Sequence, residues 1–251
     1  MHIKTLRQMK TIIQKTVAHW HKHPELPFYN PKIPSEGIFY KEREAVGFKN
    51  LTEKETRVKE GGPFEWPNMV ALNQAIMQFI GDAIKIVNVG SGTGTFELFA
   101  STDPKRHLVA SEFDPDCITW CKKNRPRENI TYCSLSMTDL LDKYRGFDLA
   151  VCVDVIEHVA DFRSFLGDFA MLANRAIITT PNRDRDLDAA RRGTPDYYQH
   201  VREWDAGELY WVLKNYYGKV TLYSMPDPYV PATKEIGFMS TLSPLIAVCE
   251  R

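Results

Sequence analysis

The glycine-rich stretch IVNVGSGTGTF, residues 86–96, constrains the fold of this chain more than any other segment. Ile86, Val87 and Val89 suit a buried parallel strand, and the glycines that follow at alternate positions allow a tight turn with bare backbone facing outward. A helix is expected from Thr95. A strand, a glycine turn and a helix in this order form a nucleotide-binding crevice at the carboxyl edge of a sheet.

The spacing of the glycines disfavours a dinucleotide as the ligand. The dinucleotide fingerprint G-x-G-x-x-G, counted from Gly90 and Gly92, requires a third glycine where this chain has Thr95. A short apolar strand, Leu108–Ala110, leads into Glu112, about 20 residues beyond the first glycine. An acidic residue at this distance grips a ribose diol in such crevices. The two features together predict a nucleoside ligand.

Several segments resemble the class I S-adenosylmethionine-dependent methyltransferases, from roughly Pro67 to the C-terminus. They are VNVGSGTGTF, SEFDP, NITYCSLSMTDL, FDLAVCVDVIEHV and AIITTPN. FDLAVCVDVIEHV and HVREW are most similar to the small-molecule O-methyltransferases of the ubiquinone-biosynthesis and sugar-modifying kind. The resemblance implies an α/β fold with a doubly wound, Rossmann-like, seven-stranded sheet, and S-adenosylmethionine as the cofactor.

The resemblance also implies a role for each cofactor-binding residue. Glu112 is expected to hold the ribose, the turn from Gly90 to Gly94 the methionine portion, and Ser136 with Met137 the adenine. The full expected set is Asn88, Gly90, Ser91, Gly92, Gly94, Glu112, Phe113, Ser136, Met137 and Asp154. Two members depart from the family pattern, because Asn88 and Ser136 stand where acidic residues are common.

The segment DVIEH supplies the candidate catalytic groups. Asp154, Glu157 and His158 have the spacing that places side chains on one face of a helix, expected here over residues 157–173. Methyl transfer from a sulfonium is a direct displacement, so the protein holds donor and acceptor in line and takes the proton of a hydroxyl acceptor. Histidine titrates near neutral pH, which makes His158, together with His200, the expected group for that proton.

The same side chains can instead bind a metal. Two carboxylates and two imidazoles, from Asp154, Glu157, His158 and His200, can hold a divalent cation such as Mg²⁺ that acidifies the acceptor hydroxyl. Related methyltransferases with a Glu-x-x-Glu-His element, including some quinone and small-RNA 3′-end enzymes, use a metal in this way, whereas this chain begins the element with aspartate. In the simplest alternative, Glu157 and His158 only begin a helix whose acidic first turn complements its dipole.

The chain divides into an N-terminal extension, residues 1–62, and a methyltransferase-like domain, residues 63–251. Apolar residues recur at helical spacing from Lys4 to Trp20, and four prolines from Pro24 to Pro34 then predict an extended arm. Such an arm can cover an active site or simply wrap on the surface. In the domain, strands expected at 86–89, 107–112, 130–134, 147–153, 175–180, 220–223 and 244–249 alternate with helices.

Composition limits the location and the partners. The 32 basic and 32 acidic residues give a net charge of zero, which disfavours nucleic acid and acidic membranes as partners. No signal-like segment and no run approaching about 20 apolar residues is visible, so a cytoplasmic location without membrane association is expected. Five cysteines suit reduced core thiols better than a disulfide framework. The pattern does not predict the oligomeric state.

Three functions stay open, and a methyltransferase that acts on an oxygen of a small-molecule acceptor is preferred. An RNA 2′-hydroxyl is the alternative acceptor, and a catalytically inactive cofactor-binding or partner-binding protein is the alternative from a different class. Residues after the expected fifth strand can recognise the acceptor through charge or stacking, or can be solvated loop and core; they are Arg183, Arg185, Arg191, Arg192, Tyr197, Tyr198 and Trp204.

Overall fold

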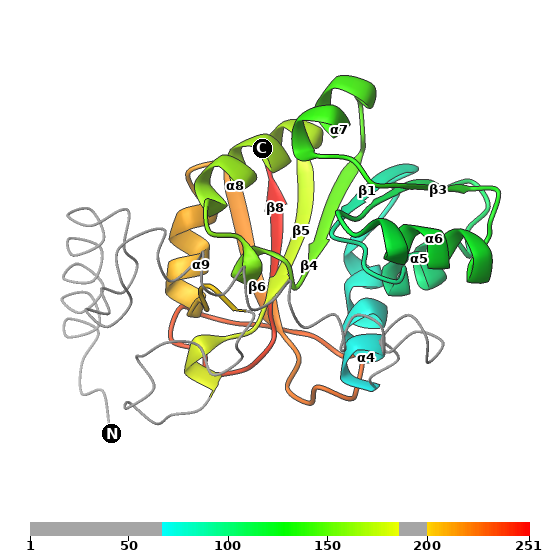
Figure 1. Cartoon of the computed structure of the whole chain (residues 1–251). Coiled ribbons are helices and arrows are strands. Elements are labelled where there is room, and N and C mark those ends of the chain that lie inside the picture. Colours follow the sequence, from blue (N-terminus) through cyan, green and yellow to red (C-terminus); the bar gives the residue numbers. More distant parts are fainter. Residues whose placement is uncertain (1–66, 186–199) are drawn as a thin grey trace, which may run out of the picture.

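The computed structural model describes residues 67–185 and 200–251 (Figure 1). The expected N-terminal extension, residues 1–62, lies outside the described residues, as do Arg191, Arg192, Tyr197 and Tyr198. The division of the chain near residue 62 therefore stays a prediction.

A single sheet lies at the centre of the described part. Its strands are β1 (Lys85–Val89), β2 (His107–Ser111), β3 (Ile130–Cys133), β4 (Leu149–Val153), β5 (Arg175–Thr180), β6 (Lys219–Ser224), β7 (Lys234–Glu235) and β8 (Leu245–Glu250). The order across the sheet is β3-β2-β1-β4-β5-β8-β6-β7. Strands β1 to β5 run parallel, and β8 runs antiparallel to its neighbours β5 and β6. The expected Rossmann-like sheet is confirmed, with the two-residue edge strand β7 added to the seven strands expected.

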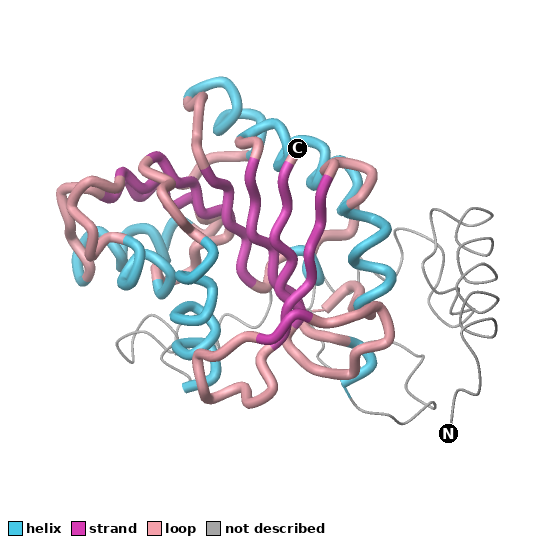
Figure 2. The backbone as a smooth tube through the Cα atoms, turned by 180° about the vertical axis from the view of Figure 1, so that it is seen from behind, coloured by secondary structure: helices cyan, strands magenta, loops and turns pink. Residues whose placement is uncertain are grey.

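Helices cover both faces of the sheet, as Figures 1 and 2 show from opposite sides. The α-helices are α4 (Pro67–Ile76), α5 (Thr95–Ala100), α6 (Pro115–Asn124), α7 (Met137–Lys143), α8 (Phe162–Leu172) and α9 (Ala206–Leu213). Val87 and Val89 of β1 pack in one cluster with α7, α8 and α9, while Ile86 packs in a second cluster with α4 and α5. Alternate residues of one strand thus bury opposite faces, which is the doubly wound arrangement. None of the helices in the described ranges has the length and apolar character needed to span a bilayer.

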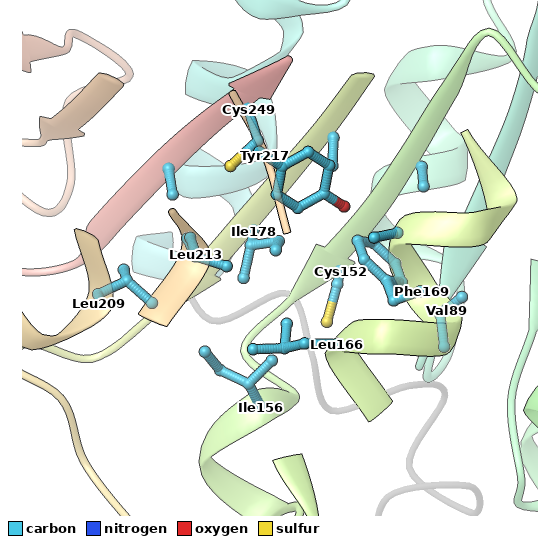
Figure 3. Close-up of a cluster of buried hydrophobic side chains, with 14 of the residues drawn as sticks. Val89, Cys152, Ile156, Leu166, Phe169, Ile178, Leu209, Leu213, Tyr217 and Cys249 are labelled. Carbon is cyan, nitrogen blue, oxygen red and sulfur yellow. The ribbon is translucent and has the colours of Figure 1, made fainter. Parts of the chain in front are cut away.

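The larger cluster is the main core of the domain. Figure 3 shows its centre, where β1, β4, β5 and β8 meet α8 and α9; the labelled residues are Val89, Cys152, Ile156, Leu166, Phe169, Ile178, Leu209, Leu213, Tyr217 and Cys249. Burial raises the pKa of the Cys152 and Cys249 thiols above their usual range. Both thiols are therefore inert packing groups in this interior.

The helix expected over residues 157–173 is wrong in its first part. A 3₁₀ turn, η2 (Ile156–His158), follows β4, and α8 begins only at Phe162, where the Asp161 side chain accepts a hydrogen bond from the Ser164 N–H. Asp154 has a left-handed backbone with φ of 50°. Asp154, Glu157 and His158 consequently do not share one helical face, and the tight turn decides where each side chain lies.

Two other boundaries show what local sequence determines. Asp205 caps α9 as expected, in a capping box with Glu208, and α9 ends at Leu213 rather than Tyr217. Helix α7 was not expected at all. It begins where the Ser136 hydroxyl accepts a hydrogen bond from the Asp139 N–H.

The glycine turn between β1 and α5 follows the expected position. Gly90, Gly92 and Gly94 have φ of 75°, 53° and 77°, in the left-handed region that favours glycine. The N–H groups of Gly90 and Ser91 both donate to the Ser111 carbonyl, at 2.8 and 3.0 Å, so the turn is fixed to the end of β2. A Cβ at Gly90 would overlap the Val155 side chain, whereas a Cβ at Gly92 would meet open space.

We expect Gly90→Ala to destabilise the protein more than Gly92→Ala. Both variants force a side chain into left-handed backbone, at about 1–2 kcal/mol. Only Gly90→Ala adds overpacking against Val155, about 1–3 kcal/mol more. Urea unfolding of the two variants and the wild type measures the difference, and equal losses of unfolding free energy would contradict this account of the close contact.

Candidate active site

Glu112 ties the end of β2 to the glycine turn. Its Oε2 accepts a hydrogen bond from the Gly92 N–H at 2.9 Å, and its Oε1 accepts one from the Asp114 N–H at 3.1 Å. Burial raises the pKa of this carboxyl, and the N–H donors of Asp114 and Gly92 act in the opposite direction. A buried carboxylate therefore lies directly beside the bare backbone of the turn.

The residues expected around the adenine lie at the ends of β2 and β3. The Glu112 N–H donates to the Cys133 carbonyl, and the Ser134 hydroxyl donates to the Phe113 carbonyl, which joins the two loops. The Phe113 ring is 70% exposed. A largely exposed phenyl ring at this edge of the sheet is of a kind that can stack on a base.

Ser136 and Met137 form the start of α7. The Ser136 hydroxyl caps the helix and donates to the Asp139 carboxylate at 2.6 Å. The aspartate that the family commonly places in this turn is thus present three residues later, bonded to the serine that replaces it.

Asp154 is held against β5. Its N–H and its Oδ1 both bond the Thr179 hydroxyl, with the hydroxyl donating to Oδ1 at 2.6 Å. Burial raises the pKa of the Asp154 carboxyl, and the Thr179 hydrogen bond and the His200 charge lower it in part. The left-handed backbone and the bond to Thr179 point this side chain to a fixed place at the carboxyl end of β4.

Glu157 and His158, in the turn η2 after β4, lie close to His200. One potential ligand atom from each lies within 4.8 Å of the others, and the two imidazole rings are 5.0 Å apart in an edge-to-face arrangement. Asp154 is not part of this three-residue group, in contrast to the four-residue set expected from the sequence. Two imidazoles and a carboxylate at this separation can share a proton or a cation.

Glu157 is the fully buried member of this group. Its Oε2 accepts from the Thr180 hydroxyl at 3.0 Å, whereas its fully buried Oε1 has no hydrogen-bond partner among the described residues. Burial, and then the neighbouring Asp154 carboxylate, raise the pKa of Glu157 well above its usual range. A buried acid with one unpartnered oxygen is costly unless something binds it.

Backbone hydrogen bonds bring His200 to this group from far along the chain. The Glu157 carbonyl accepts from the N–H groups of Val201 and Arg202 at 2.7 and 3.1 Å. Nδ1 of His200 lies 2.8 Å from Oε1 of the buried Glu203. The contact of Nδ1 with this carboxylate orients the His200 ring.

Other polar residues near this edge are structural. Arg183 donates to Glu208 and Asp205 across the start of α9, at 2.9 to 3.0 Å, so its guanidinium is committed within the protein. Trp204 is fully buried against Phe162, in agreement with the core alternative for this residue. The expected recognition of an acceptor by these two side chains has no support in their contacts.

Sequence reasoning missed three residues of the site. Glu203 lies three positions after His200, and that spacing was the available signal. Thr179 and Thr180, at the end of β5, bond Asp154 and Glu157, but nothing in the local sequence indicates this because the contact crosses between strands.

The comparisons with known proteins concern the domain as a whole. The family model of a methyltransferase domain matches residues 67–217. Comparison of the sequence with curated proteins finds no match.

Several solved structures share the fold. The methyltransferase domain of bacterial CtHen1-CN is 17% identical, with a TM-score of 0.56 over 72% of this chain and 100% of that chain. A possible histamine N-methyltransferase from Thermotoga maritima is 16% identical, with a TM-score of 0.58 over 81% and 96%. The plantazolicin methyltransferase BpumL, in complex with SAH, is 13% identical, with a TM-score of 0.57 over 86% and 100%.

Sequence identities this low show only that the folds are shared. The match to the family model covers more than half of the chain and therefore shows the family. The fold, the glycine turn and the family match agree with one another. The chain therefore belongs to the methyltransferase-domain family and is a class I S-adenosylmethionine-dependent methyltransferase.

Proposed function

We propose that the protein transfers the methyl group of S-adenosylmethionine to an oxygen of a small-molecule acceptor. The observation that carries this proposal is the contact between the glycine turn and the turn after β4. Gly90 has no room for a Cβ because Val155 packs against it, and Glu157 and His158 follow Val155 by two and three residues. The glycine turn that is proposed to face the cofactor therefore lies next to the groups that are proposed to accept the proton.

The cofactor is proposed to lie along the ends of β1, β2 and β4. Glu112 accepts the ribose hydroxyls, since its carboxylate borders the turn, and the backbone from Gly90 to Gly94 faces the methionine portion. Phe113 stacks on the adenine, whose edge lies over the start of α7. Asn88, Ser91, Ser136, Met137 and Asp154 complete the proposed set.

The acceptor hydroxyl is proposed to lie between the cofactor and the two imidazoles. His158 and His200 stand edge to face at 5.0 Å, so one proton taken from the acceptor can be held by either ring. Glu157 stabilises the positive charge that the rings then carry. Asp154, fixed by Thr179, orients the acceptor at the end of β4.

The same group fits a divalent cation. The buried Oε1 of Glu157 has no hydrogen-bond partner among the described residues and can take a cation, and Glu203 holds His200 at Nδ1 as carboxylates do at metal sites. Two imidazoles among three ligands suit a transition-metal ion such as Zn²⁺ better than the Mg²⁺ expected from the sequence, and Mn²⁺ is the transition-metal ion used as the probe. A cation bound there lowers the pKa of a coordinated hydroxyl.

The acceptor class is tested by methyl transfer from labelled S-adenosylmethionine to a catechol, D-fucose, histamine and a short RNA, each with and without Mn²⁺. Label on the oxygen of the catechol or the sugar is the expected result. Transfer only to histamine nitrogen would contradict an oxygen acceptor, and transfer only to RNA would contradict a small molecule.

Glu112→Ala is expected to weaken binding of S-adenosylhomocysteine by about 10- to 100-fold, because hydrogen bonds to a charged group contribute about 1.5–3 kcal/mol. Glu112→Gln is the matched control, since it retains an oxygen for the Gly92 N–H and loses the charge together with the acceptor for the Asp114 N–H. Isothermal titration calorimetry measures both dissociation constants, with NAD as a ligand that should not bind. An unchanged affinity in Glu112→Ala would exclude Glu112 from the cofactor site.

Removal of the cation is expected to abolish transfer to a hydroxyl acceptor, and added Mn²⁺ to restore it. Glu157→Gln and His200→Ala are expected to weaken Mn²⁺ binding at least about tenfold, whereas His107→Ala, an exposed histidine at the start of β2, should not change it. Full activity after chelation would contradict the metal and leave the two imidazoles as the proton acceptors.

Glu203→Ala is expected to weaken Mn²⁺ binding by about 10- to 100-fold without contact with the ion, because Glu203 fixes the tautomer of His200. Nitrogen NMR of the metal-free protein should show the Nδ1–H tautomer of His200 in the wild type and a mixture in Glu203→Ala. Glu203→Gln keeps an oxygen acceptor and should retain the tautomer. The same tautomer in all three proteins would refute this role.

A further inference from the structure

A hydrogen bond between β1 and α5 links the two ends of the glycine turn. Asn88, on β1, donates from Nδ2 to Oε1 of Glu97, in the first turn of α5, at 2.8 Å. The two residues are nine positions apart, so their bond connects the strand that enters the turn with the helix that leaves it. Asn88 is 2% exposed and Glu97 is fully buried.

Each partner in this bond has one polar atom left over. Asn88 Oδ1 and Glu97 Oε2 are both buried without a hydrogen-bond partner among the residues that the structure describes. These two oxygens can form a hydrogen bond with each other only if one of them carries a hydrogen. An ionised Glu97 would hold its charge in the interior with one amide as its side-chain donor, and would leave the Asn88 oxygen unpaired.

One proton on Glu97 supplies the missing donor. A carboxylic acid and a primary amide each present one donor and one acceptor side by side, so the two groups can exchange two hydrogen bonds. We propose that Glu97 is a neutral carboxylic acid in the folded protein and forms with Asn88 a reciprocal acid–amide pair that positions the cofactor turn. Glu97 is thus a positioning residue, since the turn and not the carboxyl faces the cofactor.

The surroundings of Glu97 favour the neutral form. Burial raises the pKa of Glu97 to about 7. The hydrogen bond from Asn88 and the charge of Arg125 lower this pKa, but burial has the larger effect. The titratable and charged groups that face it are Arg125 and Cys121 of the α6 segment, Glu112 after β2, and Tyr132 of β3. The Glu112 carboxylate is a like charge and also favours protonated Glu97.

The pair includes a position where this chain departs from the family pattern. An acidic residue is common two positions before the first glycine, where this chain has Asn88. In this chain a buried acid, Glu97, faces that position from the other side of the turn.

The pH dependence follows from the direction of the shift. Folded Glu97 keeps its proton up to about pH 7, whereas the unfolded chain releases it near the ordinary value of 4.5. The stability from this group is therefore complete below about pH 4.5, is lost progressively as pH rises to about 7, and stays lost above it.

Glu97→Gln tests the proposal because glutamine reproduces both hydrogen bonds without a proton. The unfolding constant of the wild type relative to Glu97→Gln is expected to rise on the order of a hundredfold between pH 5 and pH 8, from the shift of 4.5 to about 7. Glu97→Ala, which leaves Asn88 unpaired, should be less stable than both at pH 5. Carbon NMR of labelled glutamate carboxyls should show, at pH 6, a protonated carboxyl signal that is absent from Glu97→Gln.

The pH dependence of cofactor binding distinguishes a positioning role of Glu97 from a role in stability alone. The dissociation constant of S-adenosylhomocysteine should rise from pH 6 to pH 8 in the wild type and change less in Glu97→Gln. An ionised Glu97 at pH 6, or a Glu97→Gln protein less stable than the wild type at both pH values, would overturn the pair. An unaltered pH dependence of binding would overturn the positioning role, and neither NMR nor unfolding depends on the proposed acceptor chemistry.

Discussion

The parallel pairing of β1 with β2 on one side and β4 on the other is the interaction on which the rest of the site depends. Asn88 pairs with Ala110 and Val151, so the three strands end at the same height. Everything after those ends, from the glycine turn to Glu112 and η2, is short and converges on one edge. A shift of one strand by one residue would exchange its two faces and separate these groups.

Several buried acids lie in and around the candidate site, and each has different hydrogen-bond or charge partners. Glu112 has two backbone N–H donors, Glu208 has the Arg183 guanidinium, Glu203 has an imidazole, and Glu97 has one amide. Glu157 has one threonine hydroxyl and, like Glu97, keeps one buried oxygen without a hydrogen-bond partner among the described residues. Buried acids whose oxygens all have partners stabilise the fold. Buried acids with an unpartnered oxygen can still take up a proton or bind a ligand.

The sequence predicts those parts that local pattern decides. A run of β-branched residues before three glycines defines β1 and the turn, and Asp205 before Glu208 defines the start of α9. The proximity of His200 to Glu157 also follows, through the order of the strands. The 3₁₀ turn did not follow, because the residues of η2 suit an α-helix equally well and only packing ends it. The Asn88–Glu97 bond was missed for the same reason, since burial is a tertiary property.

Strand β8 has a consequence for the order of assembly during synthesis. Leu245–Glu250 lies between β5 and β6, and contributes Leu245, Ile246, Ala247 and Cys249 to the interior. Until the ribosome has released this segment, β5 has an open edge and β6 has no place in the sheet. A chain in which β8 is not yet in place therefore exposes the edge of β5, and an exposed strand edge is prone to pairing with other chains.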